Sequence, residues 1–282
     1  MRAQSAMEYL MTYGWAILII ARVLSALFQL GVFSSSTFAP KASPGSCQVS
    51  RPSGPGSTQF ISTEGVCNGE LPQYVAQFNG QSSYVRITNS PSLLSVNASN
   101  AFTVAVWSKT SSLSKLFDGA YCDEIRITGG SVEDYGTHND QAYSYIQNPS
   151  QWTFVVVTKN TSGYGNLYSN GQSVGSASGL PAVSVYPGYF FTVGAEYACG
   201  SFQNYMSGMM SNLQVYNTSL SQSEITALYQ EGIGGAPIDL QHLVGWWPLN
   251  GNAHDYSGNN NNGQTNGGVV FTANWEHGYT LS

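Results

Sequence analysis

The sequence contains little charge. Only 9% of its 282 residues are Asp, Glu, Lys or Arg, and nine basic residues leave a formal net charge of −6. A nucleic-acid-binding protein needs a basic surface, so this composition excludes that class of partner. Hydrophobic residues make up 42% and aromatic residues 13% of the chain, which excludes a disordered protein. With Gly, Ser, Asn and Tyr abundant, we expect a β-rich extracellular domain with a polar surface.

The sequence also lacks zinc and redox motifs. Its four cysteines form no C-x-x-C pair, and its four histidines show no zinc-ligand spacing. An even number of cysteines favours two disulfides in an oxidising compartment. Proximity in sequence favours Cys47–Cys67, which leaves Cys122–Cys199, although four cysteines allow three connectivities. Three triplets fit N-glycosylation outside the cell, beginning at Asn97, Asn160 and Asn217.

The N-terminal region is nearly free of charge over a long stretch. From Tyr9 to Phe33 the only charged residue is Arg22. A helix of this length would run ~37 Å, more than a bilayer span requires. Glu8 lies directly before this stretch. One interpretation is a secretory signal cut near residues 34–36, and another is a plain membrane anchor whose first turn is capped by Glu8.

The segment "QSAMEYL" resembles the class III signal peptide of archaeal type IV pilin-like proteins. This resemblance implies that a leader of residues 1–3 is removed between Ala3 and Gln4. It also implies that a helix of residues 4–33 stays on the mature protein, with Glu8 as its fifth residue. Proteins of that family are inserted in the membrane through this helix and then polymerise into surface filaments with the helices bundled in the core.

The charges of this segment suggest how subunits would align. Cleavage creates an α-ammonium group on Gln4, which the Glu8 carboxylate of a neighbouring subunit can pair with. An unpaired carboxylate in an apolar bundle is costly, so pairing favours one axial register. Arg22 departs from a pilin helix core. We expect it either to meet a carboxylate or backbone carbonyls of another subunit, or to lie near water or lipid headgroups.

Residues 34–73 are rich in Ser, Pro and Gly and predict an extended stalk. Short alternating strands follow, for example at 74–87, 101–110, 151–160 and 190–198. The dipeptide Asn170-Gly171 predicts a hairpin. The segment "SQSEITALYQEG" predicts a helix with Ile225, Leu228 and Tyr229 on one face.

The order of these features resembles the LamG-like jelly-roll family of the concanavalin A-like lectin/glucanase fold. The resembling pieces are "FNGQSSYVRI", "FTVAVW", "WTFVVVT", "LYSNGQSVGS" and "GMMSNLQVYNTSLSQSEITALY", within about residues 74–230. The resemblance implies a mainly β sandwich over residues 74–282. Its usual first strand resembles "LVGWWPLNGNAHDYSGNNNNG" at 243–263, so the chain is predicted to be circularly permuted. Residues 243–249 should then pair within the main sheets and bury Trp246 or Trp247. The alternative is a second, truncated domain at 243–282.

The sequence offers little for catalysis. The E-x-D-x-x-E run of related glucanases is missing, and the adjacent Asp123 and Glu124 would point to opposite faces of a strand. We therefore do not expect an enzyme. The LamG resemblance implies calcium as a cofactor, held by Asp255 with carbonyl groups at Asn79 and Gly80. The chain departs from that pattern at Ser211-Asn212, where many relatives have two acidic residues.

A sugar-binding site would use exposed aromatic side chains, although these could equally belong to the core or to subunit contacts. The candidates are Tyr121, Tyr135, Tyr143, Tyr145 and Tyr164.

The sequence as a whole predicts a structural subunit of an extracellular type IV pilus-like filament. The subunits would form a helical homo-oligomer and display LamG-like heads for adhesion or glycan binding. Carbohydrates or cell-surface ligands are the expected partners, with the membrane as a partner before assembly. The alternative is a membrane-anchored lectin-like adhesin that does not polymerise.

Overall fold

The structure, a computed structural model, describes residues 18–25, 71–88, 91–110, 115–118, 125–128, 131–134, 141–144, 151–178, 190–198 and 200–279. The chain divides into two compact units. In the first unit, residues 18–25 are helical, within the helix predicted for 4–33. The rest of that helix and residues 34–70 of the predicted stalk lie outside the described residues. None of the described helices has the length and apolar character needed to span a membrane. We call the described residues from 71 to 279 the head.

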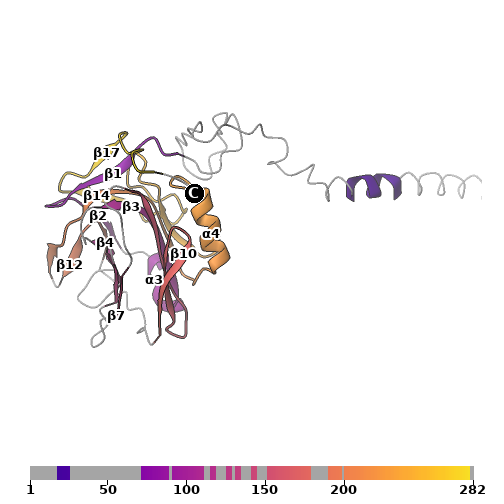
Figure 1. Cartoon of the computed structure of the whole chain (residues 1–282), viewed down its shortest axis with the longest axis horizontal. Coiled ribbons are helices and arrows are strands. Elements are labelled where there is room, and N and C mark those ends of the chain that lie inside the picture. Colours follow the sequence, from indigo (N-terminus) through magenta and orange to yellow (C-terminus); the bar gives the residue numbers. More distant parts are fainter. Residues whose placement is uncertain are drawn as a thin grey trace, which may run out of the picture. The chain divides into compact units, whose positions relative to one another are not determined.

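The head is built on two large antiparallel sheets (Figure 1). Within the described residues, the eight-stranded sheet has the order β10-β9-β8-β3-β14-β1-β17, with β15 also paired to β14. Its strands are β1 (Val75–Asn79), β3 (Phe102–Thr110), β8 (Thr153–Lys159), β9 (Gly165–Ser169), β10 (Gln172–Ala177), β14 (Ser207–Tyr216), β15 (Leu243–Trp247) and β17 (Val270–Thr272).

The seven-stranded sheet has the order β16-β2-β11-β4-β5-β6-β7. Its strands are β2 (Tyr84–Thr88), β4 (Lys115–Asp118), β5 (Ile125–Thr128), β6 (Ser131–Asp134), β7 (Gln141–Ser144), β11 (Phe190–Val193) and β16 (Gly263–Asn266). A separate pair consists of β12 (Glu196–Ala198) and β13 (Ser201–Gln203). The predicted mainly β antiparallel sandwich is therefore confirmed.

The eight-stranded sheet is covered on both faces, as its central strand shows. In β3, Val104 and Val106 belong to the core between the two sheets. Ala105 and Trp107 belong to a second apolar cluster on the opposite face. A strand buried on both sides needs a continuous apolar sequence rather than an alternating one, which explains the run "FTVAVW".

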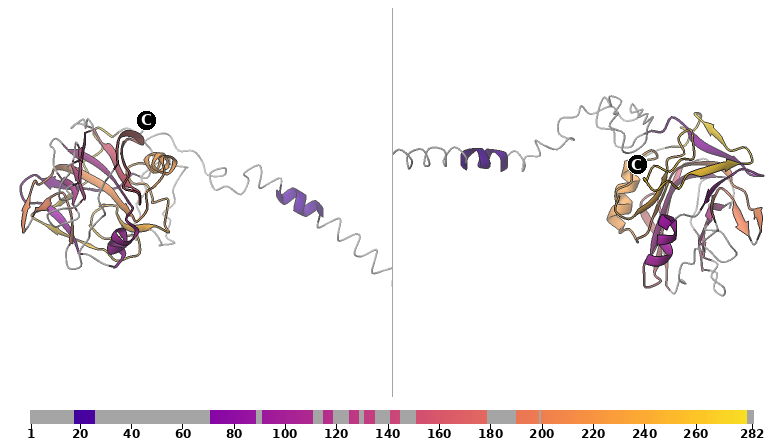
Figure 2. Two further views of the ribbon diagram at one scale, coloured as in Figure 1. Left: turned by 90° about the horizontal axis from the view of Figure 1, so that it is seen from below. Right: turned by 180° about the vertical axis from the view of Figure 1, so that it is seen from behind.

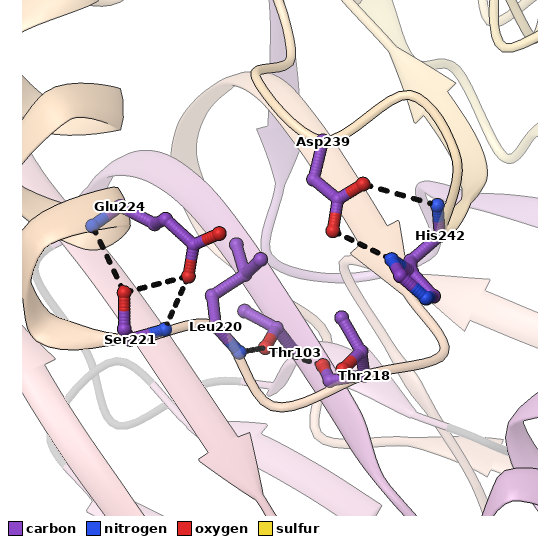
Figure 3. Close-up of polar contacts among 7 residues, drawn as sticks. All are labelled: Thr103, Thr218, Leu220, Ser221, Glu224, Asp239 and His242. Carbon is purple, nitrogen blue, oxygen red and sulfur yellow. Dashed lines mark hydrogen bonds and ion pairs between the residues drawn. The ribbon is translucent and has the colours of Figure 1, made fainter.

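Helix α4 (Gln222–Glu231) covers the second cluster and has the apolar face predicted for it, with Ile225, Leu228 and Tyr229 buried. Tyr229 stacks on Trp107 with ring centroids 5.7 Å apart. The helix begins with a capping box, in which the Ser221 side chain accepts from the Glu224 backbone N–H and Glu224 Oε2 accepts from the Ser221 backbone N–H (Figure 3). Such reciprocal bonds satisfy the free N–H groups of a helix start.

The connection from β14 to α4 is fixed by a side chain of β3. Thr103 Oγ1 donates to the Thr218 carbonyl at 2.8 Å and accepts from the Leu220 backbone N–H at 2.9 Å. Further along, His242 Nδ1 lies 2.7 Å from Asp239 Oδ2, which braces the loop before β15 (Figure 3).

The predicted hairpin is also confirmed. Asn170 and Gly171 have φ values of 50° and 77°, and they join β9 to β10 with Gln172 opposite Ser169. Positive φ at both central residues is what a type I′ turn requires, and Asn-Gly accepts it at the lowest cost. A short helix, α3 (Pro91–Ser99), was not predicted.

The C-terminal segment completes both sheets. β15 pairs with β14 from Leu213 to Tyr216, and β1 pairs with the same edge of β14 from Ser207 to Met210. Further along the segment, β16 joins β2 and β17 joins β1. Both Trp246 and Trp247 are buried, so the pairing predicted for 243–249 is present. That this order reflects circular permutation stays a prediction.

Candidate functional site

The outer face of the seven-stranded sheet carries a group of aromatic and polar side chains around β2. Along β2, Val85 and Ile87 face the core, while Arg86 and Thr88 are exposed and Tyr84 is partly exposed. Residues alternate between the two faces of a strand, so these three share the face directed away from the core.

The hairpin β12–β13 contributes further rings to this face. Phe202 stacks on Tyr84 with centroids 4.0 Å apart and an interplanar angle of 25°. Tyr205 lies 6.4 Å from Tyr84. Tyr197 lies 4.7 Å from Phe190 of β11 and 4.9 Å from Phe202. We call Tyr84, Phe190, Tyr197, Phe202 and Tyr205 the aromatic face. Figures 1 and 2 show that β12 and α4 lie on opposite sides of the head.

The guanidinium group of Arg86 lies on the aromatic face. The guanidinium carbon of Arg86 is 4.0 Å from the centroid of the Phe190 ring, a distance at which the ring quadrupole attracts the charge. Thr192 of β11 and Gln264 of β16 pair with Arg86 on its two sides. Gln264 is exposed, whereas the Thr192 hydroxyl is buried and donates to the Ala195 carbonyl.

Polar groups join the open end of the β12–β13 hairpin, where β12 begins and β13 ends. Glu196 is 3% exposed, and its two carboxylate oxygens accept from Gln203 Nε2 at 3.3 Å and Asn204 Nδ2 at 2.6 Å. Asn204 has a φ of 49°, a left-handed conformation that Asn tolerates better than most residues. These bonds hold the end of β13, with Phe202 and Tyr205 on either side of it, to the start of β12.

The environment of Tyr84 disfavours ionisation of its hydroxyl. Burial raises the pKa of the Tyr84 hydroxyl above 10.0, Tyr205 raises it further, and Arg86 opposes the shift. At neutral pH, Tyr84 can therefore both donate and accept a hydrogen bond. The face combines apolar ring surface with guanidinium, amide and hydroxyl groups.

Sequence reasoning did not find this face. Of the aromatic residues predicted for sugar binding, Tyr164 is 42% exposed and lies in the loop before β9. The side chains of Tyr121, Tyr135, Tyr143 and Tyr145 lie outside the described residues. The rings of the aromatic face come from separate strands and form no sequence motif, so only pairing of those strands could have brought them together.

Asp255, the predicted calcium ligand, is occupied within its own loop. Its Oδ1 accepts from the backbone N–H groups of Trp246 and Ser257, both at 2.9 Å. Its Oδ2 accepts from Ser257 Oγ at 2.9 Å and from the Asn261 backbone N–H at 2.8 Å. N–H and O–H donors direct positive charge at both oxygens, where a cation would have to bind.

The predicted partners of Asp255 organise a different turn. Asn79 Oδ1 accepts from the backbone N–H groups of Gln81, Ser82 and Ser83 at 2.9–3.1 Å, and the Gly80 N–H donates to the Met206 carbonyl. These contacts involve the Asn79 side chain and the Gly80 N–H, whereas the predicted calcium partners of Asp255 are the carbonyl groups of this turn. Among the described side chains, no cluster of three His, Cys, Asp or Glu residues could hold a metal ion. Calcium binding stays an untested prediction.

The position where relatives carry two acidic residues holds a neutral network here. Asn212 Oδ1 accepts from Trp246 Nε1 at 2.7 Å, and its Nδ2 donates to the Gly235 carbonyl at 2.8 Å. Ser211 Oγ donates to the Pro248 carbonyl at 3.2 Å. Both side chains are buried, and they link β14 to β15 and to the loop after α4.

The remaining predicted sites are only partly described. The side chain of Asn97, the four cysteines and the segment with Ala3, Gln4 and Glu8 lie outside the described residues. Arg22 is exposed on the helix of residues 18–25. In the loop after β8, Asn160 Oδ1 accepts from Ser162 and Tyr164.

Asn217, the third predicted glycosylation site, is anchored within the head. Its Nδ2 donates to Ser95 Oγ at 3.0 Å. A glycan would be attached at that nitrogen, so modification of Asn217 would displace this contact between β14 and α3.

Comparison with known proteins supports the fold. No curated protein matches the chain in sequence. A candidate carbohydrate-binding protein from Bacteroides ovatus is 15% identical with a TM-score of 0.56, over 72% of this chain and 60% of its own. The heptameric SAP-like pentraxin of Limulus polyphemus is 12% identical with a TM-score of 0.49, over 71% and 94%.

A third similar structure is domain 4 of AbnA, a GH43 extracellular arabinanase from Geobacillus stearothermophilus, in complex with arabinotriose. It is 22% identical with a TM-score of 0.44, over 57% of this chain and 82% of its own. This chain spans 60% of the length of the Bacteroides ovatus protein. Residues 79–226, more than half of the sequence, match the profile of the concanavalin A-like lectin/glucanases superfamily, and the chain therefore belongs to that superfamily.

Proposed function

We propose that the head is a carbohydrate-binding, lectin-like domain and that the aromatic face is its glycan-binding surface. The observation that carries this proposal is the grouping of Tyr84, Phe202 and Tyr205 beside Arg86 on one sheet face. Ligand sites for small molecules combine apolar ring surface with a few polar groups that fix orientation. The C–H side of a sugar packs on such rings, while its hydroxyls bond to guanidinium, amide and phenol groups.

Binding without hydrolysis is part of this proposal. Glycosidases on most folds use two carboxyl groups that flank the scissile bond. The described carboxylates with hydrogen bonds hold local structure instead. Glu196 joins β12 to the end of β13, Glu224 caps α4, Asp239 bonds to His242 and Asp255 fixes its loop. Membership of a superfamily named for both lectins and glucanases is compatible with either activity. The carbohydrate-binding description of the Bacteroides ovatus protein favours binding.

A glycan array with the purified full-length protein tests the proposal. We expect at least one glycan to bind, and Tyr84→Ala or Phe202→Ala to weaken binding about 3- to 10-fold, since each removes an aromatic contact. Tyr164→Ala removes an exposed ring outside the aromatic face and serves as the control. Absence of any bound glycan, or equal losses in all three variants, would contradict the proposal.

We further propose that residues 4–33 carry the head on a surface filament, into which the chain assembles after insertion in the membrane. Gln4 and Glu8 have the spacing of a processed pilin N-terminus. Within residues 18–25, Leu18, Ile19, Ile20, Val23 and Leu24 are all about half exposed or more. A helix that is apolar around its circumference needs a bundle or a membrane around it. The rival function is a membrane-anchored adhesin that does not polymerise.

Two observations distinguish a filament subunit from a membrane-anchored adhesin. Mass spectrometry should find Gln4, or its pyroglutamate form, as the first residue, and electron microscopy should show filaments on the cell surface. Glu8→Ala should leave processing intact and reduce filament yield, because the pairing that sets the register is gone. An intact Met1, or a protein found only as membrane-embedded monomers, would favour the anchor.

A further inference from the structure

Arg86 differs from the other basic side chains described in the head. Lys109 Nζ donates to the His277 carbonyl, and Lys159 Nζ donates to the carbonyl and the side-chain oxygen of Asn100. Both lysines therefore contribute to the structure. Within the described residues, the guanidinium of Arg86 forms no hydrogen bond or ion pair, and it contacts the Phe190 ring.

The ring beneath Arg86 is held in place. Phe190 is 7% exposed and lies 6.0 Å from Phe202 and 4.7 Å from Tyr197. It pairs with Thr88, two residues from Arg86 on the same strand face, so the contact is a diagonal cross-strand pair. Stacking on a fixed ring orients the guanidinium and leaves its N–H edges available to a ligand.

The ring of Tyr84, next to Arg86 on β2, determines where a sugar would lie. Tyr84 is two residues before Arg86 on the same face of β2, a separation of about 7 Å along a strand. Tyr84 is itself fixed by the stack with Phe202. A sugar ring packed beside Tyr84 would place a substituent at the edge of the Arg86 guanidinium.

The N–H edge of the Arg86 guanidinium is suited to binding a carboxylate. A guanidinium presents parallel N–H donors in a planar fork that matches the two oxygens of a carboxylate. The chain carries a net charge of −6, so it does not attract polyanions at long range. Recognition would therefore depend on one well-placed acidic group rather than on charge density.

Building on the proposed function, we infer that Arg86 selects glycans that carry a sugar carboxylate, as in hexuronic acids, over their neutral counterparts. Arg86 is in this view the residue that determines ligand specificity, whereas the aromatic face supplies binding common to acidic and neutral sugars. Sulfate esters share the anionic charge, but their oxygens are weaker hydrogen-bond acceptors than those of a carboxylate, so they are expected to bind less tightly.

Isothermal titration of the full-length protein with matched oligosaccharides tests this inference. The probes are oligogalacturonate and oligoglucuronate, each with free carboxylates and as the methyl ester, and a sulfated neutral oligosaccharide. We expect one of the free acids to bind about tenfold tighter than its ester. In Arg86→Gln the acid and the ester should bind equally, and Arg86→Lys should retain only part of the preference. Added salt should weaken the preference for the acid.

Three results would overturn the inference while leaving the proposed function standing. They are equal binding of acid and ester by the unmodified protein, a preference that survives in Arg86→Gln, and tighter binding of the sulfated probe. In each case Tyr84→Ala would still reduce binding. If neither these probes nor any glycan of the array bound, the inference and the proposed function would both fail. Unfolding curves of each variant would show that a loss of binding is not a loss of folding.

Discussion

At the scale of single residues, acidic and amide side chains in this head mainly form hydrogen bonds that stabilise its own loops and turns. Asp255 accepts four hydrogen bonds, one from the Trp246 N–H of β15 and three from Ser257 and Asn261 in its own loop. Asn79 does the same for the turn between β1 and β2. The LamG resemblance marked both as calcium ligands. A sequence alone cannot tell a carboxylate that binds a cation from one that accepts backbone N–H bonds, because the difference lies in how the loop folds.

Asp255→Ala should therefore destabilise the head without any effect of calcium. We expect the free energy of unfolding to fall by about 2–4 kcal/mol, since buried donors lose their acceptor. Denaturant titrations with and without a chelator measure this. The exposed Glu276 provides the control, and Glu276→Ala should change little. A chelator that lowered the stability of the unmodified head would show that calcium is bound after all.

Tyr216 predicts how stability responds to alkaline pH. It is fully buried, its hydroxyl donates to Gln214 Oε1 at 2.6 Å, and burial raises its pKa far above 10.0. The folded state then holds this proton more tightly than the unfolded state does. Stability is thus fully present below pH ~10 and falls as pH rises above it.

Urea unfolding of the full-length protein from pH 8 to pH 11 tests this expectation. Tyr216→Phe should be less stable than the unmodified protein at pH 8, because Gln214 loses a donor. Its stability should also fall less steeply above pH ~10. If the stability of the two proteins fell equally steeply with pH, Tyr216 would not contribute to the loss of stability above pH ~10.

At the scale of secondary structure, segments with local signals were predictable, and a pairing between distant strands was predicted only for residues 243–249, where the family resemblance indicated it. The Asn170-Gly171 turn and the apolar face of α4 depend on residues close together in sequence, and both are present. The aromatic face depends on β2, β11 and β12–β13 coming together, and no local pattern marks it. Helix α3 was missed as well, and its nine residues carry no acidic first turn or basic last turn to signal it.

The capping box of α4 offers a test at this scale. Ser221→Ala removes one of the two reciprocal bonds at the helix start and should lower the free energy of unfolding by about 1 kcal/mol. Ser221→Asp should retain most of the stability because Asp also caps helices. Glu231→Ala, at the exposed other end of α4, is the matched control and should be neutral or slightly stabilising. Equal losses in the Ser221→Ala and Glu231→Ala variants would show that the cap is not what stabilises α4.

At the scale of the whole chain, the head depends on its C-terminal segment. β15, β16 and β17 add strands to both sheets, and Trp247 fills the core between them. The sequence indicated this through the "LVGWWPLNG" piece, because that piece resembles the usual first strand of LamG-like domains but lies near the C-terminal end here. How the N-terminal helix presents the head was predicted only from the resemblance around Glu8, and it rests on processing and assembly rather than on the fold of the head.

The location of a bound glycan tests the central claim most directly. A structure of the full-length protein with a glycan identified on the array would show which surface it occupies. We predict a sugar ring against Tyr84 and Phe202, with a polar substituent at the Arg86 guanidinium. A glycan bound elsewhere on the head, with the aromatic face unchanged and uncovered, would contradict the account.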